Sequence, residues 1–112
     1  MYELTKKEKK IARDIFSKSI EKEFDAALQH SEILMTKWKN GNAKGREAFH
    51  ETLSYLNDFR KHLQRRYDDL RSSFYLMNLA GILKDGYITE EDLKAFSDEA
   101  KETIKRYLDL YK

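Results

Sequence analysis

The sequence predicts an all-α fold: an antiparallel helical bundle of three to four helices built on two long helices. The 112 residues contain no Pro, no Val and no Cys, and only 4 Gly, so residues that interrupt helices or favour strands are scarce. Apolar side chains recur at steps of three and four, the spacing that places them on one face of a helix. The length suits one domain, residues 1–112, with a single core.

The first long helix is expected over about residues 5–39. Thr5 and Glu8 have the spacing of a capping box, in which each side chain accepts a hydrogen bond from a backbone N–H of the first turn. Asn40-Gly41-Asn42 can form the turn that ends the helix. The apolar stripe between these signals contains Ile11, Ile15, Ile20, Phe24, Ala27, Leu28, Leu34, Met35 and Trp38.

The stretch from Phe49 to Leu83 is the one around which we expect the other helices to be arranged. Because an amphipathic helix is unstable alone, its stripe should be covered by other helices. We predict a break at Ser72-Ser73, with Ser73 capping the second part, and therefore helices over about 46–71 and 74–84. The stripe keeps its phase across the two serines and contains Phe49, Leu53, Leu56, Leu63, Tyr67, Leu70, Phe74 and Met77, with Arg60 at the skipped position.

A last helix is predicted over residues 89–111. Thr89 and Asp92 form a second capping box, and Ile88 and Leu93 are spaced to pack together as a hydrophobic staple. Asp85-Gly86 precedes this signal and ends the helix before it.

Two motifs resemble metal sites, and both are incomplete. Asp85-Gly86 through Asp92 has the spacing of half a calcium-binding loop, but the matching first and third positions are Gly81 and Leu83, which offer no side-chain oxygen. Glu47 and His50 form one Glu-x-x-His step, whereas a di-iron bundle needs two. We therefore predict no metal and no cofactor. Because the chain has no Cys and its Ser and His residues form no catalytic signature, we also predict no catalytic residues.

The best candidate binding residues form a basic run with Tyr67 inside it, which suits contacts to nucleic acid or another anion. The alternative that we favour is internal pairing, because residues 85–102 carry seven acidic residues and two lysines. In that arrangement Arg60 lies in the seam beside a carboxylate. The basic run consists of Arg60, Lys61, Arg65, Arg66 and Arg71.

These observations favour a non-catalytic interaction or assembly module that binds itself as a homodimer, or another protein. A long bundle with 14 aromatic residues (Trp 1, Tyr 7, Phe 6) has too little interior for all its apolar side chains, and exposed apolar patches mark association sites. Nucleic-acid binding is the alternative, and a metal-dependent helical enzyme is third. The charged N-terminus lacks a signal peptide and no window reaches the roughly 18 apolar residues of a membrane span, so we expect a cytoplasmic protein without a membrane partner.

Overall fold

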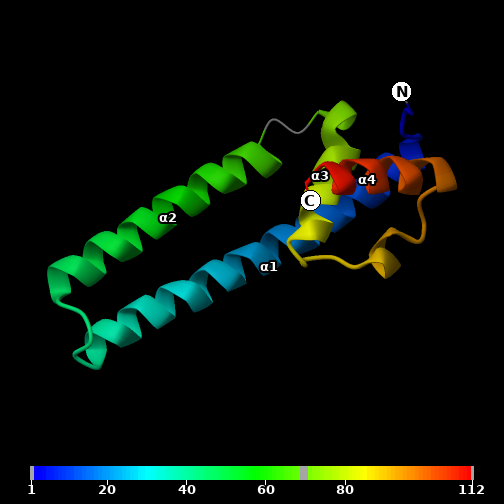
Figure 1. The fold of residues 1–112 in the computed structure, drawn as a ribbon. Helices are drawn as coiled ribbons and strands as arrows, with labels where there is room; N and C mark the ends of the chain where they lie inside the picture. Colours follow the sequence, from blue (N-terminus) through cyan, green and yellow to red (C-terminus); the bar gives the residue numbers. More distant parts are fainter. Residues whose placement is uncertain (1, 69–70, 112) are drawn as a thin grey trace. The chain divides into compact units, whose positions relative to one another are not determined.

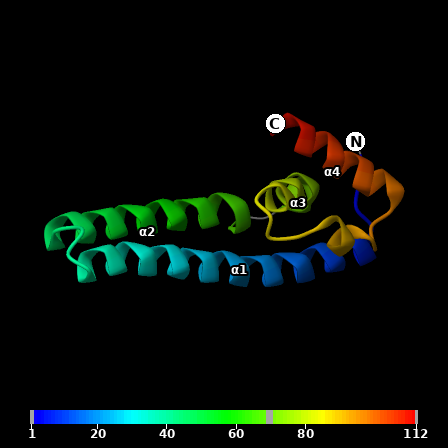
Figure 2. The same ribbon diagram turned by 60° about the horizontal axis from the view of Figure 1, so that its bottom comes forward.

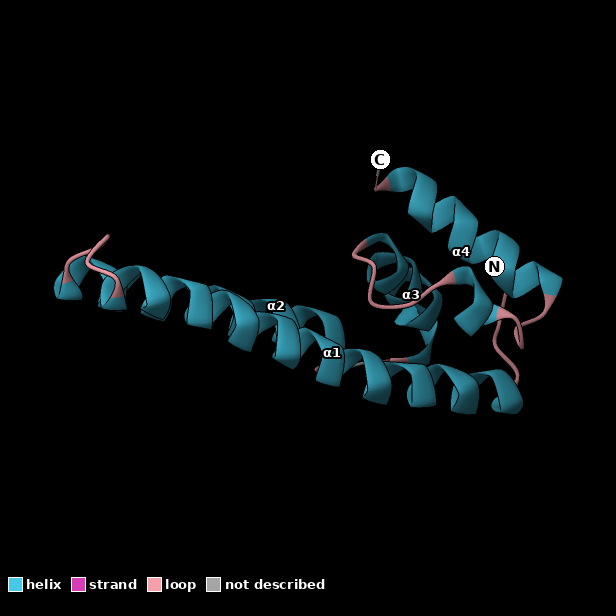
Figure 3. Cartoon of the chain, turned by 90° about the horizontal axis from the view of Figure 1, so that it is seen from below, coloured by secondary structure: helices cyan, strands magenta, loops and turns pink. Residues whose placement is uncertain are grey.

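The computed structural model describes residues 2–68 and 71–111, and in them every regular element is helical (Figure 3). No strand occurs in these residues, so the all-α prediction is confirmed. None of their helices is long and apolar enough to cross a lipid bilayer. The elements are α1 (Lys6–Lys39), α2 (Gly45–Tyr67), the 3₁₀ turn η1 (Ser72–Phe74), α3 (Tyr75–Lys84), the 3₁₀ turn η2 (Glu90–Leu93) and α4 (Asp98–Leu110).

The chain divides into two compact units. The terminal unit contains residues 1–20 and 69–112, and the hairpin unit contains residues 21–68. Helix α1 contributes its first part to the terminal unit and its second part to the hairpin unit.

The terminal unit has a conventional aliphatic core between α3 and α4, which pack against each other (Figure 1). Leu79, Ile82 and Ile104 are its largest fully buried side chains. Phe16 of α1 meets Tyr75 of α3 edge to face, with the ring centroids 5.2 Å apart. The apolar sequence of α3 is therefore enclosed, as its composition predicts.

The predicted turn at Asp85-Gly86 ends α3 as expected. Gly86 has a φ of 84°, a left-handed conformation that a residue with a Cβ adopts only with strain. The Tyr87 N–H donates to the carbonyl oxygen of Ile82 at 3.2 Å, which closes the end of the helix.

The hairpin unit consists of the second part of α1 and the whole of α2, which run antiparallel to each other (Figures 1 and 2). A turn over residues 40–44 joins them, with Gly41 at a φ of 82°. Two ring pairs connect the helices: Phe24 with Phe59, and His30 with Tyr55 at a centroid distance of 4.1 Å.

The predicted break between α2 and α3 is confirmed, but its details differ. Helix α2 ends at Tyr67, earlier than expected, and η1 precedes α3. Ser73 was the wrong cap, because the capping position of α3 is Phe74, which makes no side-chain cap bond. Leu70, part of the predicted stripe, lies outside the described residues.

The prediction of one helix over residues 89–111 is wrong, because α4 begins only at Asp98. Thr89 and Asp92 do cap a helical segment, with the Thr89 N–H donating to the Asp92 carboxylate at 2.8 Å, but that segment is the short turn η2. The Ser97 N–H, which a continuing helix would direct at the Leu93 carbonyl, donates instead to Glu8 Oε2 at 3.0 Å. Ser97 then caps α4 by accepting from the Ala100 N–H.

The stripe predicted on α2 is covered only in part. Ala48 is buried and Thr52, Tyr55 and Phe59 are half-buried, whereas Phe49 and Leu53 of the predicted stripe are exposed. The rings of Tyr55 and Phe59 meet the rings of α1. Arg60, expected in the seam, is also exposed.

Candidate functional site

An apolar groove lies beside the turn of the hairpin unit. Met35, Trp38 and Phe49 border it, and Ala48 and Thr52 also line it. Its volume is about 310 Å³. The three bordering side chains are 52%, 55% and 64% exposed, respectively, although residues of this kind are usually inside a folded protein.

Further exposed apolar side chains lie on both helices, at spacings that place them on the same helix faces as the residues that border the groove. On α1, Leu28 precedes Met35 by seven residues, and on α2, Leu53 and Leu56 follow Phe49 at helical spacing. Contiguous exposed apolar surface on a soluble protein marks a site of interaction. We call this surface the hairpin apolar face; it consists of Leu28, Met35, Trp38, Phe49, Leu53 and Leu56.

A buried carboxylate, Glu23, joins the two helices of the hairpin unit. Its side chain is 1% exposed. Glu23 Oε1 lies 2.6 Å from His62 Nε2 and accepts from Arg66 Nη1 at 3.1 Å, and Oε2 accepts from the Tyr67 hydroxyl. We call these four residues the Glu23 cluster. A buried charge is tolerated when it is paired and hydrogen-bonded in this way.

The structure separates the five residues of the predicted basic run into two groups. Arg66 belongs to the Glu23 cluster, with its side chain 13% exposed. Arg60, Lys61, Arg65 and Arg71 are exposed, and none forms an ion pair with another described residue of its own unit. One guanidinium therefore has an internal carboxylate partner, on α1. Pairing of Arg60, Lys61 and Arg65 with the acidic last helix stays a prediction, as does the role of the basic run as an anion-binding site.

A second buried carboxylate, Glu8, lies in the terminal unit and is 5% exposed. It completes the predicted capping box with Thr5, each side chain accepting from the other residue's N–H at 3.1 Å. Burial alone would raise the pKa of Glu8, but hydrogen bonds from the Tyr2 hydroxyl and from the N–H groups of Ser97 and Thr5 outweigh it and lower the pKa to about 2. Glu8 therefore stays ionised and links α1 to the start of α4.

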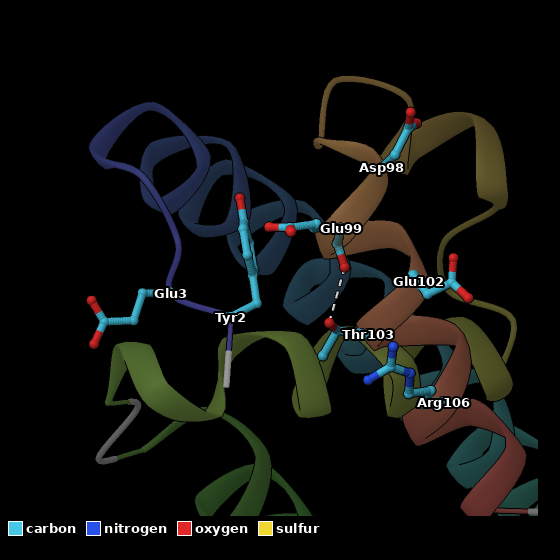
Figure 4. A pocket seen from close by; sticks show the side chains of 7 residues that line it. All are labelled: Tyr2, Glu3, Asp98, Glu99, Glu102, Thr103 and Arg106. Atoms are coloured by element: carbon cyan, nitrogen blue, oxygen red, sulfur yellow. Dashed lines mark hydrogen bonds between the residues drawn. The ribbon is translucent and has the colours of Figure 1, made fainter.

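A hollow of about 810 Å³ lies between the N-terminal segment and α4 (Figure 4). Tyr2 and Glu3 reach it from the N-terminal segment, and α4 supplies three further carboxylates and Arg106. Among the described residues, no group of three or more His, Asp or Glu side chains could hold a metal ion. A wide acidic surface attracts cations of many kinds, so we assign it no ligand.

The sequence analysis missed Glu23, although a signal for it exists. Glu23 occurs four residues after Ser19 and four before Ala27, and all three are buried. A carboxylate at that position of a stripe predicts a basic partner on a facing helix. His62 and Arg66 are one helical turn apart on α2 and provide it.

Comparison with known proteins gives one match. A family model described as photoprotection regulator fluorescence recovery protein matches residues 4–107, nearly the whole chain. No curated protein and no solved structure matches. The description is that of a regulator, in agreement with the non-catalytic function predicted from the sequence.

Proposed function

This chain belongs to the photoprotection regulator family of fluorescence recovery proteins, and we propose that it regulates by binding other protein molecules. The first of these is a second copy of itself, held at the hairpin apolar face. The second is the photoprotective protein whose effect on fluorescence the regulator reverses. The observation that carries the proposal is the exposure of Met35, Trp38 and Phe49 around one groove.

Self-association follows from the energetics of that face. Fully burying a large apolar side chain is worth about 1.5–3 kcal/mol, and Trp38 and Phe49 are more than half exposed. A second hairpin unit presents the same apolar side chains, so a two-fold contact covers both faces at once. Aromatic residues and Met are also the types enriched at such contacts.

The mass of the chain in solution tests self-association. We expect light scattering after gel filtration to give about twice the chain mass for the parent and the single chain mass for Phe49→Glu, which places a charge in the contact. Leu110→Glu is the matched control, because Leu110 is 78% exposed and lies in the terminal unit; it should keep the parent's mass. A monomeric parent, or a Leu110→Glu variant that dissociates as fully as Phe49→Glu, would contradict the proposal.

Regulation of a photoprotective protein is tested by the return of fluorescence. In a light-harvesting preparation whose fluorescence has been lowered by its photoprotective protein, the added chain should speed the recovery. Phe49→Glu reports whether the self-associated form is required, and Leu110→Glu is again the control. Recovery at the same rate with and without the parent chain would contradict this function.

Nucleic-acid binding is the second candidate, supported by the exposure of Arg60, Lys61 and Arg65 on α2. If these cations contact phosphates, binding to single-stranded RNA or DNA should weaken steeply as salt increases. Replacing Arg60 and Arg65 by Ala tests this without touching Arg66, which the Glu23 cluster needs. Binding that is weak at physiological salt and unchanged in this double variant would exclude the candidate.

A further inference from the structure

A second groove with apolar side chains lies in the terminal unit, against α4. Its volume is about 530 Å³, within the range of small-molecule sites. Four apolar residues line it: Leu83 at the end of α3, Leu93 at the end of η2, and Ile104 and Leu108 on α4. Two of these elements, α3 and α4, pack against each other (Figure 1).

Three lysines stand on the rim of this groove. Lys94 forms an ion pair with Glu91, with its Nζ 2.8 Å from Glu91 Oε1. Lys101 and Lys105 are exposed, lie one turn apart on α4, and form no ion pair with another residue that the structure describes. Two ammonium groups at the edge of an apolar floor are arranged to receive an anion that carries an apolar body.

Two acidic residues that also line the groove limit the size of the ligand's anionic head. Asp109 lies one turn beyond Lys105 on the same helix, and Glu90 begins η2. An extended acidic peptide would bring its charges against these carboxylates, whereas a ligand with one anionic head can keep that head beside Lys101 and Lys105.

We propose that this α4 groove binds an amphiphilic anion, with its apolar body on Leu83 and Leu108 and its single anionic head between the ammonium groups of Lys101 and Lys105. The chemical class is that of a medium-chain carboxylate or of a single-chain lipid with an acidic head. The site is independent of the hairpin apolar face, so the proposal stands or falls separately from self-association.

Titration calorimetry with decanoate, below its critical micelle concentration, tests the site on the full chain. We expect saturable binding that becomes about tenfold weaker when Lys101 and Lys105 are both changed to Glu. The matched control is Lys6→Glu with Lys10→Glu, two exposed lysines at the same spacing on α1, and it should bind like the parent. Decan-1-ol, which lacks the charge, should also bind at least about tenfold more weakly than decanoate.

Two further arms locate the site and identify the source of the ligand. Phe49→Glu should bind decanoate like the parent; loss of binding there would place decanoate on the hairpin apolar face and overturn the proposal. Co-sedimentation with phosphatidylcholine vesicles that contain lysophosphatidylglycerol, if it requires Lys101 and Lys105, would assign the anion to a single-chain lipid, and decanoate binding without co-sedimentation would assign it to a free amphiphile. Equal decanoate affinity in the parent and the Lys101→Glu, Lys105→Glu variant would also overturn the proposal.

Discussion

The terminal unit buries large aliphatic side chains, whereas the largest side chain fully buried in the hairpin unit is a carboxylate. Leu79, Ile82 and Ile104 lie in the first, and Glu23 in the second. In the hairpin unit the other buried residues include Ala27, Ser31, Leu34 and Ala48, while six exposed apolar side chains form the hairpin apolar face.

This difference reflects how many elements each unit contains. The terminal unit has α3, α4 and the first part of α1, so a side chain can be covered from several directions. Two antiparallel helices share only one line of contact and leave the flanks of their apolar stripes open. The hairpin unit therefore depends on polar links such as the Glu23 cluster and, in our proposal, on a second copy that covers its flank.

The largest expected change in stability comes from a substitution in the aliphatic core of the terminal unit. Leu79 is 0% exposed, so Leu79→Ala should lower the free energy of unfolding by about 2–5 kcal/mol. Urea denaturation followed by circular dichroism measures it. Leu110→Ala, at a site 78% exposed, should stay within about 0.5 kcal/mol of the parent; a similar loss in both variants would mean that Leu79 lies in no specific core.

The next effect concerns Glu8 and the dependence of stability on pH. Its pKa is lowered from 4.5 to about 2, so the carboxylate stabilises the fold above the unfolded-state pKa, and this contribution is lost as the pH falls from about 4.5 towards 2. The contribution is up to about 3 kcal/mol. Denaturation of the parent at pH 7, 5 and 3 should show the loss, and Glu8→Gln should show less of it. The control is Glu3→Gln, at an exposed glutamate, which should lose stability with falling pH as the parent does. If Glu8→Gln also lost as much stability as the parent, the acid sensitivity would come from another group.

A smaller effect is expected at the carboxylate of the hairpin unit. Glu23→Gln removes the charge that Arg66 and His62 face, and it should lower the free energy of unfolding by about 1–3 kcal/mol. The exposed neighbour Glu21 gives the control, Glu21→Gln, with a change under about 0.5 kcal/mol. If both variants were as stable as the parent in urea, the Glu23 cluster would contribute nothing to the hairpin.

The smallest effect on intrinsic stability is expected at Phe49. Because its side chain is 64% exposed, Phe49→Glu should change the unfolding free energy of the dilute single chain by under about 0.5 kcal/mol. The parent's melting temperature should increase with protein concentration, since association stabilises the folded state, and that of the variant should not. Concentration-independent melting of the parent would separate the apolar face from self-association.

The features that the sequence predicted correctly depend on near neighbours in the chain. Thr5 and Glu8 are three residues apart, as are Thr89 and Asp92, and both pairs form the expected bonds. The turns at Gly41 and Gly86 have the left-handed conformation that glycine suggests. Such signals involve one helical turn, so they do not require knowledge of the tertiary fold.

The features that the sequence did not predict depend on distant residues. Glu23 bonds to residues 39 to 44 positions away, and α4 begins late because the Ser97 N–H donates to Glu8, 89 positions earlier. The apolar stripe of α2 predicted the helix correctly but predicted the wrong buried face. It placed Phe49 in the interior, whereas the structure buries the neighbouring residue Ala48 and leaves Phe49 exposed. This choice depends on tertiary packing.

Trp38 is the only tryptophan of the chain, and it borders the groove of the hairpin apolar face. Its indole, 55% exposed, is in contact with water in the single chain and should emit at long wavelength. Excitation of this chromophore therefore reports on the hairpin unit alone. Covering the groove should shift the emission to the blue and protect it from iodide quenching, so the chain carries its own label for the moment at which a partner is bound.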